Sequence, residues 1–338
     1  MFTPVETSVG AVLLHQATSA LLFQCGSILG ASGYLRRLFT APTKETVLFF
    51  AGMALSSLPL RMFLPELVIR YPPVPTTWQA ALVTAGLGAL VGWGTKASNG
   101  CTSGHMLCGL SRLSGRSVVA VSTFLSTALL THHLVHPSLR TEICPVGTPC
   151  YTPTYPSSSA TAALLVLAAT VILATRTIPR LVAKATEAKA TDASDKPDAV
   201  SPARQVTQFL VGLEFGLGLQ ISQMASPSKL LAFFSFPVLE TWDPSLGMVM
   251  LFGVLPNLIE NKMRGFEKAP DFNCKFDLPK KTIKDIDWKF ILGAAVFGVG
   301  WGLSGTCPGP AVLRAIAQPA WGLFWMTGYW AGGKLLPS

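Results

Sequence analysis

The sequence contains little charge: only 13% of its 338 residues are Asp, Glu, Lys or Arg, whereas an ordinary soluble domain has about 25%. Half of the residues are apolar, and the mean hydropathy is +0.46. So few charged side chains cannot cover the surface of a soluble protein, and intrinsic disorder would require the opposite composition. The composition therefore predicts an integral membrane protein and argues against a soluble enzyme.

Motifs of catalysis and cofactor binding are also missing. The sequence has no Walker loop, dinucleotide fingerprint or HExxH pattern, and its seven cysteines include no CxxC pair. His132, His133 and His136 have no Cys or carboxylate partners nearby in the chain, so they do not form a zinc motif. We therefore expect no enzymatic activity, no cofactor and no metal site. The net charge of +9 falls mainly in loops, which indicates membrane orientation and not nucleic-acid binding.

Long, nearly uncharged runs recur along the chain at lengths that suit helices crossing a bilayer. The runs lack the short polar–apolar alternation of a membrane barrel. They predict an all-α polytopic membrane protein with nine spans and short re-entrant helices. The spans are 7–35, 46–60, 71–95, 117–139, 143–175, 205–224, 244–259, 290–313 and 315–333.

Basic residues in the loops predict the orientation of the chain. Residues 176–204 contain six basic residues and residues 261–289 contain eight, whereas residues 137–159 contain only Arg140. Because basic loops stay in the cytoplasm, we expect an external N-terminus and a cytoplasmic C-terminus, in the plasma membrane. Residues 183–204 are low in large apolar side chains and predict a flexible cytoplasmic linker. Cys144 and Cys150 fall in the outer loop, where a disulfide would suit an oxidising compartment.

The two sides of this linker resemble each other. Residues 86–110 and 293–316 both contain Gly-Trp-Gly, a Gly/Ser turn and then a cysteine. Four spans, one connecting span and four further spans would place the halves in opposite orientations, an architecture typical of transporters. We therefore expect a first transport repeat at 1–140, a connecting region at 141–204 and a second, inverted repeat at 205–338. The alternative is a chance likeness between glycine-rich membrane helices.

Each repeat contains a cysteine loop that cannot be a lipid-facing helix. Residues 99–105 (NGCTSGH) are polar and rich in glycine, and residues 305–310 (GTCPGP) contain two prolines. Such backbone exists at membrane depth only where it is buried in protein or lines a wet cavity. The apolar runs that follow, 106–113 and 311–317, predict re-entrant half-helices, the first capped by Thr102 or Ser103 and the second begun by Pro308.

Half-helices that start at these loops would direct free N–H groups toward the cysteines, so inversion predicts a paired anion site. No Arg lies in either loop, which argues against sulfate or phosphate and favours a soft anion with an exposed sulfur. The predicted substrate-binding residues are Cys101, Cys307, Cys25, Asn99, Gly100, Thr102, Ser103, Gly104, His105, Thr306, Pro308 and Gly309.

Three further residues are weaker candidates. Lys96 could hold positive potential beside the pathway or extend to the membrane interface. Cys108 could contact substrate, although packing is the commoner role of a free cysteine. Glu214 lies inside a predicted span, where an acid is a functional suspect by default.

These residues carry a family resemblance. Residues 92–114 (GWGTKASNGCTSGHMLCGLSRLS) and 300–315 (GWGLSGTCPGPAVLRA) are similar to the two signatures of the YeeE/YedE (sulphur transport) family. The resemblance implies nine spanning helices, re-entrant helices, an hourglass shape and thiosulfate passing between cysteine thiols. It assigns the functional thiols to Cys101 and Cys307, and also to Cys25. The second signature departs from the family at Thr306 and Pro310.

The sequence therefore predicts a membrane transporter that takes up thiosulfate or a related small anion, with the lipid bilayer as its surroundings. Alternatives are a membrane thiol redox protein, which would usually use a CxxC pair, and a transporter of another sulfur or selenium species. A soft-metal transporter would need clusters of Met, Cys and His. A structural membrane protein would not need glycine-rich breaks in both halves.

Overall fold

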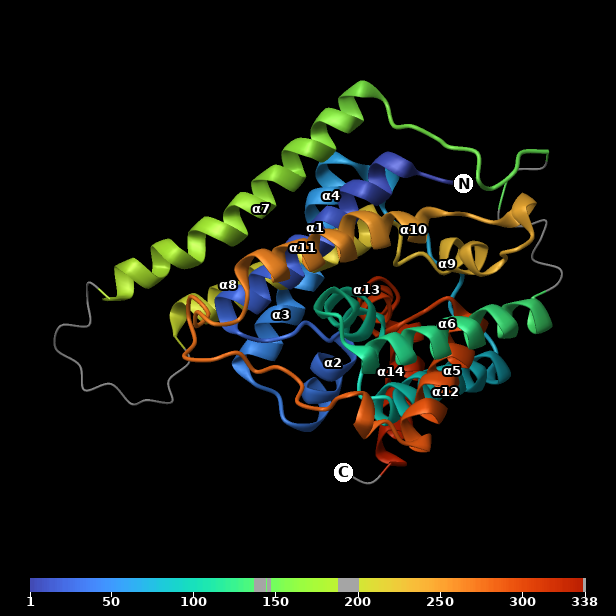
Figure 1. Ribbon diagram of the computed structural model, residues 1–338. Helices are drawn as coiled ribbons and strands as arrows, with labels where there is room; N and C mark the ends of the chain where they lie inside the picture. Colours follow the sequence, from blue (N-terminus) through green and yellow to red (C-terminus); the bar gives the residue numbers. More distant parts are fainter. Residues whose placement is uncertain (137–143, 145–146, 188–200, 337–338) are drawn as a thin grey trace.

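The computed structural model describes residues 1–136, 144, 147–187 and 201–336 of the chain. The described residues are mostly helical and contain no named strand, only two isolated bridges. Figure 1 shows the helices packed side by side, with α7 along one edge of the molecule. The prediction of an all-α polytopic membrane protein is confirmed.

The helices fall into two groups by length. The longer elements are α1 (Pro4–Cys25), α3 (Lys44–Leu55) continued by α4 (Ser57–Phe63), α5 (Trp78–Ala97), α6 (Gly115–Val135), α7 (Ser158–Glu187), α8 (Pro202–Ile221), α10 (Ser245–Val249) continued by η6 (Met250–Val254) and α11 (Leu255–Arg264), α12 (Trp288–Ser304) and α14 (Pro319–Lys334). The shorter elements are α2 (Ala31–Thr40), η1 (Pro65–Leu67), η2 (Ser103–Gly109), η3 (Leu110–Arg112), α9 (Pro227–Phe234), η5 (Leu239–Thr241), η7 (Ile283–Asp285) and α13 (Pro308–Ala317).

Several long helices begin at side chains that satisfy their first free backbone N–H groups. Thr43 accepts from the Thr46 amide at α3, and Thr77 accepts from the Ala80 amide at α5. Asp287 caps α12 in the same way. These caps lie at the polar ends of apolar runs, so the sequence specifies where the helices start.

The helix ends correct several predicted spans. The first run was expected over 7–35, but α1 ends at Cys25 because Gly26 adopts a left-handed conformation with φ +71°, and α2 is a separate helix. The fifth run was expected from residue 143, but α7 begins at Ser158 and continues past residue 175 to Glu187. The eighth run breaks after Ser304. Residues 188–200 of the predicted linker lie outside the described residues.

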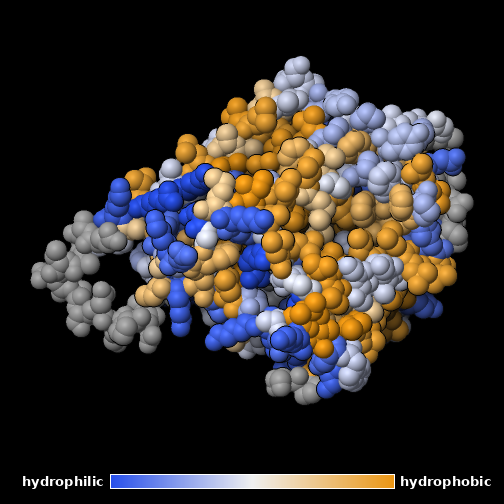
Figure 2. Space-filling view, viewed as in Figure 1, coloured by the Kyte–Doolittle hydropathy of each residue, from blue (hydrophilic) through white to orange (hydrophobic). Residues whose placement is uncertain are grey.

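The surface indicates an environment of lipid. Among the described residues, four helical segments are long and apolar enough to cross a membrane: Lys44–Phe63, Gly115–Val135, Ser158–Thr186 and Trp288–Ala317. Large apolar side chains such as Leu134 and Leu323 are largely exposed on these and neighbouring helices. Apolar residues dominate the face seen in Figure 2, while hydrophilic residues gather toward its edges. The chain is therefore an integral membrane protein; the count of nine spans stays a prediction.

Glycines allow the helices of the two halves to approach closely. Gly88 and Gly92 of α5 lie against the backbone of Trp325 and Tyr329 in α14, where an added Cβ would come within 2.2 Å of a carbonyl oxygen. Gly328 of α14 packs in return on Ala85 of α5. Small residues that bring helix backbones together are the usual glue between membrane helices. Here they join an element from each half of the chain.

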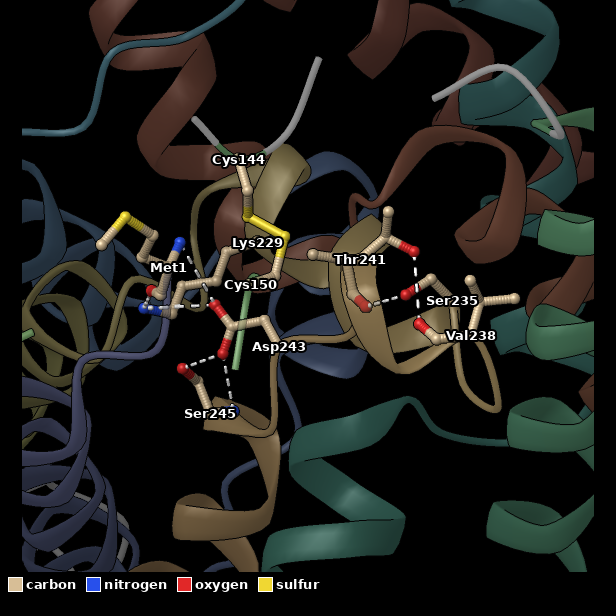
Figure 3. The surroundings of a disulfide bond; sticks show 10 residues. Met1, Cys144, Cys150, Lys229, Ser235, Val238, Thr241, Asp243 and Ser245 are labelled. Carbon is tan, nitrogen blue, oxygen red and sulfur yellow. Dashed lines mark hydrogen bonds and ion pairs between the residues drawn. A yellow bond between two sulfur atoms is a disulfide. The ribbon is translucent and has the colours of Figure 1, made fainter. Parts of the chain in front are cut away.

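A disulfide links Cys144 to Cys150, which confirms the pairing considered from the sequence. Figure 3 shows it beside the N-terminus, where Asp243 forms ion pairs with the Met1 amine and with Lys229. The Phe2 amide donates to the carbonyl of Cys150, 2.9 Å away. The disulfide and the start of α1 therefore lie at the same end of the molecule.

Candidate functional site

Three of the cavities lie at successive positions along α1. The first, which we call the N-terminal cavity, has a volume of about 490 Å3 and is lined by Thr3 and Glu6 at the start of the helix. Leu14, near its middle, lines a second cavity, which we call the waist. Ser27, just past its end, lines a third cavity of about 530 Å3, which we call the vestibule. Since α1 is about 33 Å long, the two larger cavities lie near opposite ends of this helix and the waist lies near its middle.

The waist is small and apolar. Its volume is about 40 Å3, which is roughly the space of one water molecule in the liquid. Neither Lys, Arg, Asp nor Glu lines it. The lining comprises Leu14, Ala31, Cys101, Thr102, Ser103, Met106, Leu107, Phe215, Leu219, Met224, Leu230, Leu246, Val249, Trp301, Cys307, Gly309 and Pro310.

Cys101 and Cys307 both line the waist although they lie far apart in the sequence. Thr102, which follows Cys101, is 205 residues away from Cys307, yet the two are in contact. The Thr102 hydroxyl donates to Sγ of Cys307 at 3.6 Å. Because Cys307 accepts this bond, its own S–H remains free to donate elsewhere. Sγ of Cys101 lies 3.3 Å from Oγ of Ser103, which in turn accepts from the Ala31 amide at 2.9 Å. Both thiols are buried.

The second loop leads into a regular helix. Cys307 occupies the position just before α13, and Pro308 occupies its first turn, as expected. Prolines 308 and 310 have no N–H, and the Ala311 amide donates to the Cys307 carbonyl. In this turn only Gly309 therefore keeps an N–H without a helical partner. The sequence predicts several free N–H groups at the start of this helix, but only one N–H without a helical partner remains beside Cys307.

The first loop leads into a π-helical segment, η2, instead of a half-helix over 106–113. The expected caps are absent: neither Thr102 nor Ser103 accepts from the first turn, because Ser103 is used by Ala31. Bracing comes from His105, whose Nε2 donates to the Ser98 carbonyl at 3.1 Å. Its Nδ1 lies 3.0 Å from the Ser117 hydroxyl, from which it accepts.

The predicted binding residues divide among the cavities. Five of them line the waist, and four others, Asn99, Gly100, Gly104 and His105, line the vestibule. Thr306 and Pro308 flank Cys307 without lining either cavity. Cys25 also lines neither; it ends α1, and its carbonyl accepts from Asn273. The structure therefore brings together two of the three proposed thiols.

The weaker candidates lie away from the waist. Lys96 donates to the carbonyls of Gly333 and Leu336 and so holds the end of α14. Cys108 donates to the Leu29 carbonyl at 3.6 Å. Glu214 is fully buried, and within the described part of the chain its carboxylate oxygens have no hydrogen-bond partner. The histidines bond to backbone: His133 to Phe236 and His136 to Leu303.

Sequence reasoning missed most of the waist lining, because apolar residues of membrane helices carry no signal of what they face. Met106, Met224 and Trp301 are the most informative of these residues. The Trp301 side chain is only 2% exposed, and its indole N–H finds no acceptor among the residues that the structure describes. The one sequence feature that singled out Trp301 is the Gly-Trp-Gly motif of the second signature.

Together, these features define the class of protein: a polytopic helical membrane protein with a narrow, thiol-lined waist between two larger cavities. Its relatives are known as well. The Family of unknown function (DUF6691) matches residues 204–335. A protein named "Probable transporter" from Xylella fastidiosa (strain Temecula1 / ATCC 700964) is 36% identical over 112 residues, which are 33% of this chain and 74% of the relative.

A second "Probable transporter", from Xylella fastidiosa (strain 9a5c), is 36% identical over 126 residues, which are 36% of this chain and 88% of the relative. Another protein of that strain and name is 38% identical over 109 residues, 32% of this chain and 73% of the relative. The chain belongs to the family of these Xylella proteins. Each relative is much shorter than this chain, so each match covers about a third of it.

Proposed function

We propose that this protein is a membrane transporter that takes up thiosulfate, or a related small anion with an exposed sulfur, through the waist. The observation that carries the proposal is that Cys101 and Cys307, from distant parts of the chain, line one narrow cavity between two wide ones. The names of the Xylella relatives support transport as the general activity.

The size of the waist determines what a passing anion experiences. A cavity of about 40 Å3 cannot admit an anion with its hydration shell. Dehydration is costly unless the protein replaces the lost hydrogen bonds. Two donors of lining residues could replace them: the S–H of Cys307 and the indole N–H of Trp301, which has no acceptor among the described residues. Two weak donors suit an anion of low hydration energy.

The rest of the lining favours sulfur over oxygen. Met106, Met224 and the two cysteines present polarizable sulfur atoms to the cavity. Sulfate exposes only oxygens and prefers guanidinium forks, which the waist lacks. Thiosulfate carries a terminal sulfur that can lie against these side chains. The resemblance to the YeeE/YedE family points to the same substrate.

Helix packing supports the proposed inverted repeats at 1–140 and 205–338. In such an arrangement α1 corresponds to α8, α5 to α12, and α6 to α14. The corresponding contacts occur in pairs: α1 packs on α8, α5 packs on α12, and α5–α14 is matched by α6–α12. Likewise, α3 would correspond to the continuous helix formed by α10, η6 and α11. The contact of α3 with α8 is then matched by the contact of that helix with α1. Opposed repeats around a central site are the common plan of secondary transporters.

The disulfide supports the proposed orientation, with the N-terminus outside the plasma membrane, because disulfides persist in oxidising compartments. Cys274 is exposed and belongs to a basic loop at the opposite end. A membrane-impermeant maleimide should therefore label Cys274 only after the cells are permeabilised. Labelling of Cys274 in intact cells would reverse the orientation.

The function is tested by uptake into vesicles that contain the purified protein and expose the disulfide side. Labelled thiosulfate should enter, and excess unlabelled thiosulfate should compete far better than sulfate. Uptake of labelled sulfite and selenite is measured in parallel, and uptake of either in place of thiosulfate would identify a different substrate. If external sulfate competes as well as thiosulfate, the waist does not select for sulfur and the proposed mechanism is wrong.

A further inference from the structure

Several arginines line the vestibule, and the proposed pathway between the thiols gives them no role. Five cations line it: Arg36, Arg37, Arg112, Arg116 and Lys281. Two carboxylates, Glu45 and Asp277, also line it, and Glu45 is already paired with Arg204 at 3.0 Å. The cavity therefore carries an excess of positive charge.

The arginines are held by contacts that leave most of their N–H donors available. Arg112 donates Nε to the Cys108 carbonyl at 2.9 Å, and Arg36 donates weakly to the Thr95 carbonyl at 3.4 Å. Arg37 stacks on Tyr34. Within the described ranges of the chain, none of the four arginines forms an ion pair with a carboxylate within 4.0 Å.

Arg116 is the strongest indication that the vestibule binds an anion. Its side chain is 93% buried, its guanidinium lies 4.2 Å from the ring centre of Phe290, and its Nε has no hydrogen-bond partner among the described residues. A buried guanidinium N–H without an acceptor is unfavourable. An anion in the vestibule would satisfy it.

The N-terminal cavity shows that an excess of positive charge is not a general feature of the two wide cavities. There, Lys229 is paired with Asp243, and Glu6 and Glu66 add further negative charge. Of these two cavities, only the vestibule has more cations than carboxylates in its lining. Its volume of about 530 Å3 has room for on the order of fifteen waters, so an anion could remain hydrated there.

We propose that the vestibule is a second anion-binding site, which holds a hydrated, doubly charged oxyanion next to the waist by means of Arg36, Arg37, Arg112 and Arg116. Gly104 and Asn99 belong to this chamber while the neighbouring Cys101 and Ser103 line the waist, so the two sites adjoin. The site recognises charge and oxygen, and therefore binds sulfate as well as thiosulfate. Its place in transport rests on the proposed function.

Sulfate is the probe that separates this site from the waist, because under the proposed function the waist selects against sulfate. Equilibrium binding of labelled sulfate is measured on the full chain purified in detergent. Wild type and Cys307→Ala should bind sulfate equally. Arg112→Gln and Arg116→Gln should bind about tenfold to a hundredfold more weakly, the usual effect of losing a hydrogen bond to a charged partner. High salt should weaken wild-type binding.

Adjacent lysines provide a matched control. Lys281 lines the vestibule and Lys280 does not, although both are exposed. Lys281→Gln should weaken sulfate binding, whereas Lys280→Gln should bind as wild type. Arg36→Gln, at a half-buried position, repeats the arginine test if Arg116→Gln fails to elute as a folded protein in size-exclusion chromatography.

The outcomes separate this inference from the proposed function. Arginine-dependent sulfate binding without thiosulfate uptake would refute the proposed function and retain the vestibule site. Thiosulfate uptake with absent or arginine-independent sulfate binding would refute the vestibule site alone. Displacement of labelled sulfate by phosphatidylglycerol, but not by thiosulfate, would identify a lipid phosphate as the occupant and overturn a site for free oxyanions.

Discussion

The two cysteine loops reach the same cavity through different local structures. Before Cys101 the chain turns at Asn99, with φ +56°, and enters the π-helical segment η2, which His105 ties to neighbouring backbone and to α6. Before Cys307 it turns at Gly305, with φ +60°, and enters a ten-residue α-helix begun by Pro308. The first loop depends on tertiary hydrogen bonds, whereas the second is specified by its own residues.

This comparison indicates that the two loops share a cavity but not a backbone conformation. A π-helical segment is rare and often marks a functional site. Its geometry is kept here because Ser98 and Ser117, on either side of the loop, both bond His105. The second loop needs no such brace, because proline fixes φ at the start of its helix. The two thiols should therefore be equivalent in function but unequal in their structural support.

The largest expected effect tests the functional equivalence. Cys101→Ala and Cys307→Ala should each lower thiosulfate uptake about ten- to a hundredfold, because each removes a polarizable thiol that contacts a dehydrated anion, an interaction with a charged partner worth roughly 1.5–3 kcal/mol. Cys307→Ser should rescue poorly, since it restores a donor without the polarizable sulfur. Uptake is measured at equal membrane abundance. Near-normal uptake by either alanine variant would remove the central claim.

The next prediction tests the unequal support. His105→Ala leaves the Ser98 carbonyl and the Ser117 hydroxyl without their partner, at a cost of about 1–3 kcal/mol for each buried group. Pro308→Ala, at a first-turn position that alanine also tolerates, should cost less than about 1 kcal/mol. Thermal unfolding in detergent compares the two. Equal destabilisation would show that the loops are supported alike.

Cys25 should have a smaller effect than the paired cysteines. It is buried at the end of α1 but lines neither the waist nor the vestibule. Cys25→Ala should therefore lower thiosulfate uptake less than about tenfold, as expected for a small packing change. Cys144→Ala, far from the waist, is the control and should leave uptake per molecule unchanged. An effect of Cys25→Ala as large as that of Cys101→Ala would place a third thiol in the essential pathway.

The smallest expected effect concerns the contribution of Asp285 to stability. Asp285 lies just before α12, the helix that leads to the second cysteine loop. Asp285 accepts from the backbone and hydroxyl of Thr282, and these bonds lower its pKa below the ordinary value of 3.8. A lowered folded-state pKa gives stability that is present above the ordinary pKa and is lost as the pH falls through the folded value. The wild type should lose slightly more thermal stability than Asp285→Asn between pH 5 and pH 3. Identical pH profiles would contradict the assignment.

Much of the architecture could be predicted from local signals. Apolar runs located the membrane helices, and Pro308 marked the start of α13 because proline lacks the N–H that a first turn does not need. The ends were less accurate where a single residue decided them. Gly26 stops α1 ten residues before the predicted end: it adopts a left-handed conformation, and its amide donates back to the carbonyls of Leu21 and Leu22.

The candidate site could be predicted only in part. The polar loops around Cys101 and Cys307 were visible because polar, glycine-rich backbone is anomalous within membrane runs. Leu219, Met224 and Trp301 were not, because an apolar residue in an apolar helix has the same sequence signature whether it faces lipid, protein or a cavity.

The sequence by itself determined the class of the protein, because membrane insertion depends on composition and run length, which are properties of each segment alone. It also determined where the chain breaks at its two cysteine loops. Only the tertiary structure decided that Cys101 and Cys307 share one waist, that His105 braces a π-helical segment, and that four arginines surround one chamber. These arrangements join residues from distant helices, and the contacts that fix them exist only once the helices have packed together.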